Sequence, residues 1–137
     1  MLQIVYISSA RSVISAPVCL AILRQSRINN ERANVTGLLV AGQRRFLQVL
    51  EGPTDTVRTT FARILADPRH YACVVISERY LEERQFGAWA MGFEAGGPDA
   101  ADGETLTPIV DALVAPLKDA SLRAQFTGFA KLQSRAA

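Results

Sequence analysis

The stretch VTGLLVAGQRRFLQVLEGPT, residues 35–54, decides the fold, because it holds two strands and the turn between them. Residues 35–41 and 44–50 are rich in Val, Leu and Phe, which favour strands. Gly42 suits the first position of a two-residue hairpin turn. Residues 52–54, Gly-Pro-Thr, end the second strand and open a helix. The stretch therefore predicts a β-hairpin that leads into a helix.

A strand and a helix precede the hairpin, and two strands follow the helix after it. Residues 2–8 predict a strand, and apolar residues at helical spacing predict a helix over residues 15–28. The helix after the hairpin ends at Asp67, because the following proline disfavours helical backbone there. Residues 72–77 and 86–93 predict the last two strands.

The order β-α-β-β-α-β-β, with tail helices over residues 105–117 and 121–132, predicts an α+β fold of the ferredoxin-like type. In this topology we expect the first and third strands to lie side by side and parallel, with the first two helices on one face. Both sides of these strands are largely apolar. The C-terminal helices or a second copy of the chain must therefore cover the other face.

Composition favours one cytoplasmic domain. Of 137 residues, 49 % are hydrophobic and 20 % are charged. The net charge is +2, and the basic residues are scattered along the sequence. We therefore expect no nucleic-acid partner, and no apolar run has the length of a membrane span. Cys19 and Cys73 each lie in an apolar run, which favours buried reduced thiols over a disulfide or a metal site.

The chain lacks the residue patterns of common enzymes. His70 is the only histidine, and no other residue is spaced to share a zinc ion with it. There is no Ser-His-Asp set in a recognisable turn and no glycine-rich phosphate loop. We therefore expect a protein that is not an enzyme, with no catalytic residues and no metal.

Three polar residues interrupt apolar elements. Gln48 and Tyr6 sit in the middle of two strands expected to be neighbours, and Asn30 follows the first helix. A buried amide or phenol without a partner costs about 1–3 kcal/mol, so these groups should meet. Two interpretations stay open on these residues: a polar network that pins the core, and a ligand site.

Four motifs resemble those of the BLUF family of flavin-binding blue-light sensors. They are NERANVTGLL (30–39), RFLQVLEG (45–52), DPRH (67–70) and FGAWAMGF (86–93). Tyr6 also stands at the separation from Gln48 that this family shows. The resemblance covers roughly residues 1–95, which it implies are a flavin-binding domain, and it leaves residues 96–137 as a helical extension packed on the sheet.

The resemblance implies a flavin ring, of FAD or of FMN, between the first two helices and flanked by Ile22 and Ile64. The polar contacts it implies lie at the rim of the ring: Asn29, Asn30, Arg63, Asp67, Arg69 and His70. Without the resemblance, the two isoleucines are ordinary core. Arg63 and Asp67, one helical turn apart, then form an exposed ion pair of little energetic value.

The resemblance also implies the photoactive residues. Tyr6 would supply an electron and a proton to the excited flavin, and Gln48 would rearrange its hydrogen bonds. Trp89 and Met91 share one face of the last strand and would lie beside Gln48, although packing alone also explains them. We expect a partner protein or a changed homo-oligomer to read the signal.

Two rival functions use the same fold. One is a ferredoxin-like protein-interaction module without a chromophore, which predicts a colourless protein. The other is a hydrolase of the acylphosphatase type, for which Arg11 is present but the phosphate-cradling glycines are missing.

Overall fold

The computed structural model describes residues 1–11, 16–42, 44–86, 92–95, 110–112, 114–115 and 117–136. Its elements are β1 (Leu2–Ala10), α1 (Ala16–Ala33), β2 (Thr36–Ala41), β3 (Arg45–Gly52), α2 (Thr54–Leu65), β4 (His70–Tyr80), β5 (Gly92–Ala95) and α4 (Ala120–Ala136). This order confirms the predicted ferredoxin-like α+β fold.

Several element boundaries differ from the prediction. α1 continues through both asparagines expected to end it, and it stops before Asn34, which adopts the left-handed backbone with φ 58°. β4 is longer than predicted and is irregular where Ala72 has φ 53°. β5 begins at Gly92 and extends to Ala95, two residues beyond the predicted end, and residues 87–91 of the predicted strand lie outside the described residues.

The prediction that the first and third strands run parallel is wrong. The sheet order is β4-β1-β3-β2-β5, and β3 pairs antiparallel with both β1 and β2. The reason is the hairpin: β3 must run opposite to β2, and it inserts between β1 and β2, which point the same way because α1 crosses over between them. β5 then pairs parallel with β2.

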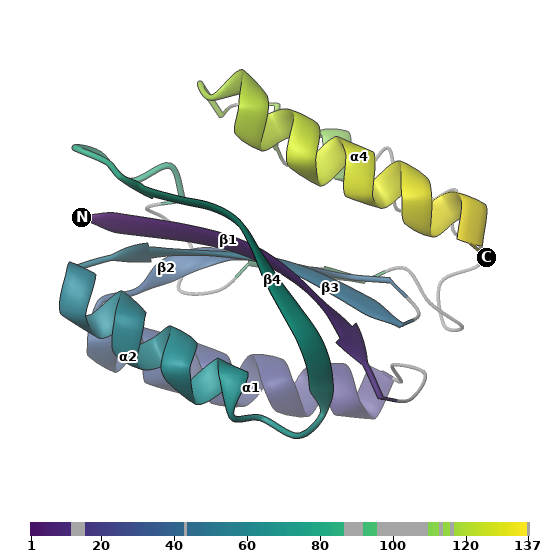
Figure 1. Cartoon of the computed structure of the whole chain (residues 1–137), viewed down its shortest axis with the longest axis horizontal. Helices are drawn as coiled ribbons and strands as arrows, with labels where there is room; N and C mark the ends of the chain where they lie inside the picture. Colours follow the sequence, from purple (N-terminus) through teal and green to yellow (C-terminus); the bar gives the residue numbers. More distant parts are fainter. Residues whose placement is uncertain are drawn as a thin grey trace.

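Helices cover both faces of the sheet. α1 and α2 lie on one face and α4 lies on the other (Figure 1). The core under α1 and α2 includes buried residues of the sheet and of α2: Leu2, Ile4, Leu39, Leu50 and Val57. The core under α4 includes Val5, Val40, Val49, Phe126 and Phe129. The prediction that a C-terminal helix covers the second apolar face is confirmed.

Two glycines permit close packing of β2 and β3. A Cβ on Gly37 would lie 1.9 Å from the Val49 carbonyl oxygen, and a Cβ on Gly52 would lie 2.6 Å from the Asn34 carbonyl oxygen. Both distances are far below van der Waals contact, so only glycine allows these backbones to approach. The close approach of these backbones thus explains why glycine follows Thr36 and Glu51 in the sequence motifs.

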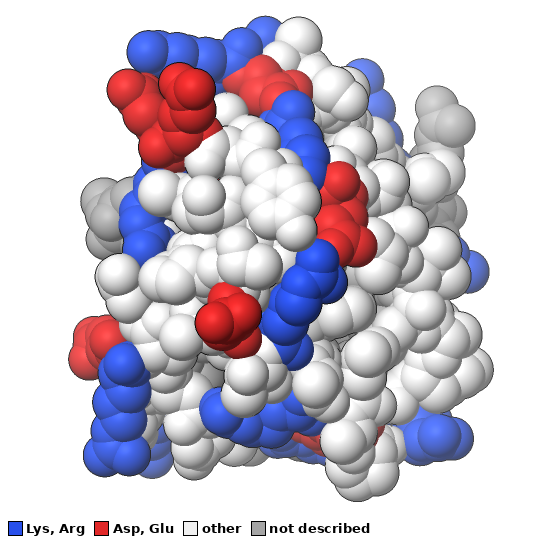
Figure 2. Space-filling model, turned by 60° about the vertical axis from the view of Figure 1, so that its left-hand side comes forward, with Lys and Arg blue, Asp and Glu red and all other residues white. Residues whose placement is uncertain are grey.

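Figure 2 shows a face on which basic and acidic side chains lie next to one another, around an uncharged area. Such a mixture gives this face no broad field of one sign. Within the described part of the chain, no helix combines the length and the apolar character that crossing a membrane requires.

Candidate functional site

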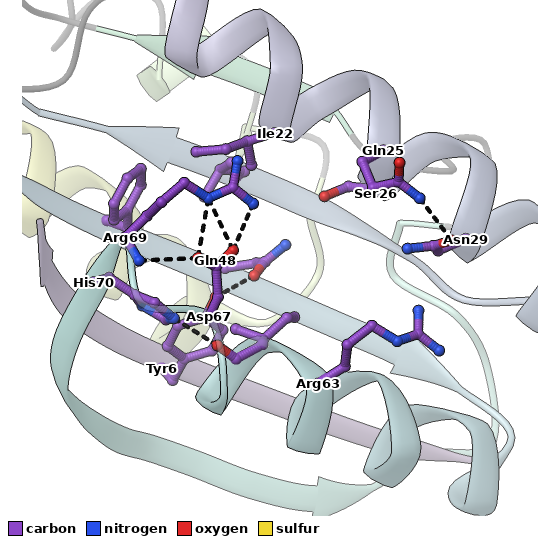
Figure 3. A pocket seen from close by; sticks show the side chains of 13 residues that line it. Tyr6, Ile22, Gln25, Ser26, Asn29, Gln48, Arg63, Asp67, Arg69 and His70 are labelled. Carbon is purple, nitrogen blue, oxygen red and sulfur yellow. Dashed lines mark hydrogen bonds and ion pairs between the residues drawn. The ribbon is translucent and has the colours of Figure 1, made fainter.

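A pocket of about 130 Å³ opens between α1, α2 and the sheet (Figure 3). α1 lines it with Ile22, Gln25, Ser26 and Asn29, which share one side of the helix because of their spacing. The sheet and the segment from α2 to β4 supply the rest: Tyr6, Leu39, Phe46, Gln48, Arg63, Ile64, Asp67, Arg69 and His70. Apolar walls with a few converging polar groups are typical of sites for small organic ligands.

Tyr6 and Gln48 form the hydrogen-bonded centre of the pocket. They lie opposite each other on β1 and β3, and the Tyr6 hydroxyl donates to Gln48 Oε1. Only 3 % of Tyr6 and 4 % of Gln48 is exposed. The prediction that these two side chains meet is confirmed, through an antiparallel register instead of the parallel one.

Burial strongly raises the pKa of the Tyr6 phenol above its ordinary value of 10.0, and the nearby Cys73 and Asp67 raise it further. The Tyr6 ring packs against Phe61 with the ring centroids 5.2 Å apart. The phenol is therefore protonated at neutral pH, and it is available as a hydrogen-bond donor.

His70 forms a wall of the pocket beside Tyr6, with the ring centroids 6.5 Å apart. Its Nε2–H donates to the Ile64 carbonyl oxygen at 2.6 Å, since a carbonyl can only accept. Its Nδ1 lies 2.8 Å from the Ser8 hydroxyl oxygen. These two contacts tie His70 to both β1 and α2, so its ring has little freedom to turn.

Asp67 pairs with Arg69 and not with Arg63. Arg69 Nη2 lies 2.5 Å from Asp67 Oδ2, and the Arg69 backbone N–H also donates to Oδ1 at 2.9 Å. The hydrogen bonds from Arg69 hold the pKa of the Asp67 carboxyl below its ordinary value. The interpretation of Arg63 and Asp67 as an ion pair is wrong, because α2 ends at Leu65 and helical spacing does not reach Asp67.

The two asparagines at the end of α1 differ in position. Asn29 lines the pocket, and its Oδ1 accepts a hydrogen bond from Gln25 Nε2 at 3.1 Å. Asn30 is 2 % exposed and lies next to the pocket lining instead of in it; its backbone oxygen accepts the Val35 N–H at 2.9 Å. Its role in binding stays a prediction.

Sequence reasoning missed four lining residues: Gln25, Ser26, Leu39 and Phe46. The signals were present, because Gln25 and Ser26 follow Ile22 by three and four residues on the helix. Leu39 is the register partner of Gln48 on β2, and Phe46 shares the face of Gln48 on β3. Trp89 and Met91 lie outside the described residues.

The described residues hold no group of three or more His, Cys, Asp and Glu side chains able to bind a metal ion. What the pocket offers instead is a buried phenol and amide in contact, two isoleucines on facing helices, and a rim of amide, carboxylate and guanidinium groups. Such a set suits a small organic ligand with an apolar body and a polar edge.

Comparisons with known proteins match this description. The family model for sensors of blue light using FAD, BLUF, matches residues 1–92. The chain is 37 % identical over 68 residues to the photoactivated adenylate cyclase subunit beta of Euglena gracilis, across 50 % of this chain and 8 % of that protein. It is 39 % identical over 62 residues to the blue light- and temperature-regulated antirepressor BluF of Escherichia coli K12, across 45 % of this chain and 15 % of BluF. Most of each relative thus lies outside the similarity.

Solved structures agree. The dark-state structure of BlrB, a BLUF protein, has a TM-score of 0.69 and 27 % identity, across 93 % of this chain and 95 % of BlrB. A bacterial light-regulated adenylyl cyclase has a TM-score of 0.68 and 29 % identity, across 84 % of this chain and 32 % of the cyclase. The family model covers well over half of the chain, and the chain therefore belongs to the BLUF family of flavin-based blue-light sensors.

Proposed function

We propose that Tyr6 and Gln48 are a light-driven hydrogen-bond switch beside the bound flavin. The observation that carries this proposal is their buried hydrogen bond inside the pocket. A bound flavin supplies the absorption of blue light and, once excited, a strong one-electron oxidant. In this proposal Tyr6 would give an electron and then its hydroxyl proton to the flavin. Both would soon return to Tyr6, and the rearranged hydrogen bond would persist until the amide of Gln48 relaxes in the dark.

Gln48 converts this transfer into a lasting change. Its Oε1 accepts the Tyr6 hydroxyl, and its Nε2 presents two donors at the other end of the amide. Loss of the phenol proton removes the donor that orients the amide. The side chain then rotates or tautomerises, and it offers the flavin carbonyl a hydrogen bond that shifts the absorption to the red. Trp89 and Met91 complete the surroundings of Gln48 in this proposal.

The lining residues fit a flavin ring. Ile22 and Ile64 provide apolar contacts from the two facing helices, and Asn29 provides an amide at the rim. Asp67, held as a carboxylate by Arg69, accepts a ring N–H, and Arg63 donates to a ring carbonyl. The remaining proposed contacts come from Asn30 and His70. We propose FAD as the native flavin, in line with the description of the family.

Residues 1–95 act in this proposal as the flavin-binding domain and residues 96–137 as its helical extension. We propose a cytoplasmic homo-oligomer that signals to a partner protein. An oligomer is supported by β4, an edge strand that exposes 57 % of Val74 and 44 % of Ile76. The reducing compartment is supported by Cys73, which is a free thiol.

The absorption spectrum tests the proposed function. The purified chain, supplied with FAD, is expected to turn yellow, and blue light is expected to shift its flavin band to the red until it recovers in the dark. Spectra before and after illumination measure the shift, and mass spectrometry of the flavin retained from cells separates FAD from FMN. A colourless protein, or identical spectra in darkness and light, contradicts the proposal and favours the interaction module.

Asn30→Ala is expected to weaken flavin binding about tenfold, the effect of losing one hydrogen bond of about 1–1.5 kcal/mol. Fluorescence titration of apoprotein with FAD measures the Kd. Arg32→Ala is the matched control, because Arg32 is exposed on the same helix and does not line the pocket. An unchanged Kd for Asn30→Ala removes this residue from the site.

A further inference from the structure

A chain of polar side chains crosses the sheet on the face opposite the pocket. Gln3 and Glu51 are register partners on β1 and β3, three residues from Tyr6 and Gln48 along the same strands. Because side chains alternate between faces, this second pair lies on the α4 side. The two central strands thus carry a side-chain hydrogen bond on each face, and both bonds depend on how these strands are placed.

The series of side-chain contacts begins at the buried carboxylate of Glu51. Glu51 is 0 % exposed, and its Oε1 accepts the backbone N–H of Phe86 at 2.5 Å. The N–H of Gln85 also donates to this carboxylate, and Gln3 Nε2 donates to Oε2 at 3.1 Å. Glu51 therefore holds the segment that leads toward β5, and it orients the amide of Gln3.

Gln3 links Glu51 to β4 through Arg79, and Arg79 in turn contacts the N-terminus of α4. With its Nε2 directed at Glu51, its Oε1 accepts Arg79 Nε at 3.1 Å. Arg79 Nη2 forms an ion pair with Asp119 Oδ2, and Asp119 Oδ1 accepts the Leu122 N–H at 2.9 Å in the first turn of α4. In every link a donor meets an acceptor, so the orientation of each group depends on the one before it.

We propose that Glu51 is a positioning residue that couples α4 to the light-sensitive strands through Gln3, Arg79 and Asp119. This inference rests on the proposed function and adds the route of its output. A shift of β1 against β3 after the Gln48 rearrangement moves Gln3 relative to Glu51, and the ion pair carries the change to the first turn of α4. α4 responds because its N-terminus is held by this ion pair and by the hydrogen bonds of Asp119.

Hydrogen exchange of the full-length, flavin-loaded chain in darkness and in light tests the coupling. In the unmodified chain, light is expected to change the exchange of amides in the first turns of α4 by about fivefold or more, the usual size of a coupling between sites. Asp119→Asn keeps an oxygen to accept the Leu122 N–H but loses the ion pair. It is expected to keep the red shift of the flavin and to lose the light-dependent change in α4.

Glu51→Gln tests the role of Glu51, at which the series of side-chain contacts begins. Phe86 and Gln3 donate to different oxygens of Glu51, and an amide at this position replaces one of these oxygens with an NH2 donor, so one of the two contacts loses its acceptor. A reversed Gln3 amide would in turn present a donor to Arg79. The variant is expected to lose the response of α4 and keep the red shift. If it does not fold, Arg79→Gln, at a side chain that is 37 % exposed, decides the question together with Asp119→Asn.

Glu78→Gln is the matched control, because it removes an exposed ion pair with Arg58 from the same strand on the pocket side of the sheet. It is expected to keep both the red shift and the response of α4. The inference is overturned if α4 does not respond in the unmodified chain while the red shift is present. It is also overturned if Asp119→Asn and Arg79→Gln respond fully. Absence of the red shift in the unmodified chain instead contradicts the proposed function.

Discussion

Gln48→Leu is expected to abolish the light-induced red shift while the flavin stays bound. Leucine has no hydrogen-bonding group, so it neither accepts the Tyr6 hydroxyl nor donates to a flavin carbonyl. The new hydrogen bond that the proposal assigns to the light state then has no donor. Difference spectra during blue illumination measure the shift, which is expected to fall below detection.

The matched control for this variant is Gln25→Leu, the same substitution in the same pocket but on α1 and outside the Tyr6 contact. It is expected to retain a shift of normal size, even if the flavin is held less tightly. Folding is checked by thermal unfolding, because a buried phenol that loses its acceptor costs about 1–3 kcal/mol. A normal red shift in Gln48→Leu would remove Gln48 from the switch.

Tyr6→Phe is expected to block the photocycle at its first step. Phenylalanine keeps the ring that packs on Phe61 but has no hydroxyl proton to release, and it is much harder to oxidise than a phenol. The yield of the red-shifted state per absorbed photon is expected to fall to about zero, and fluorescence of the bound flavin should rise because the electron donor is gone. Time-resolved absorption and fluorescence lifetimes measure both effects.

Tyr71→Phe is the control for this second variant, since Tyr71 is 48 % exposed on β4 and its contact with Arg11 needs only the ring. It is expected to switch normally. If Tyr6→Phe also switched with a normal yield, a different donor, with Trp89 the first candidate, would have to take the place of Tyr6.

The pairing of Tyr6 with Gln48 was predictable from sequence, although the direction of their strands was not. Alternation places both side chains on one face of neighbouring strands, whichever way these run. Direction depends on connectivity, because a strand returning through a tight hairpin must oppose the strand before it. The hairpin makes β3 antiparallel to β2, and the crossover through α1 makes β1 parallel to β2, so β3 must also be antiparallel to β1.

The partner of Asp67 was not predictable from spacing alone. A separation of four residues indicates a contact only within a helix, and α2 ends two residues before Asp67. Glu51 illustrates the opposite case. It shares a strand face with Leu47 and Val49, so alternation already indicated a carboxylate directed into an apolar layer. Its partners come from distant elements, and only the folded chain identifies them.

The apolar layer beneath α4 matters for anyone who grafts this photosensor onto another protein. The family signature stops at residue 92, but Val5, Val40 and Val49 are shielded by side chains that arrive from beyond it. A fusion truncated at the end of the signature would expose this apolar face of the sheet to water and make the protein prone to aggregation. A chimera must therefore retain the C-terminal helix, or the fused protein must supply an equivalent apolar surface.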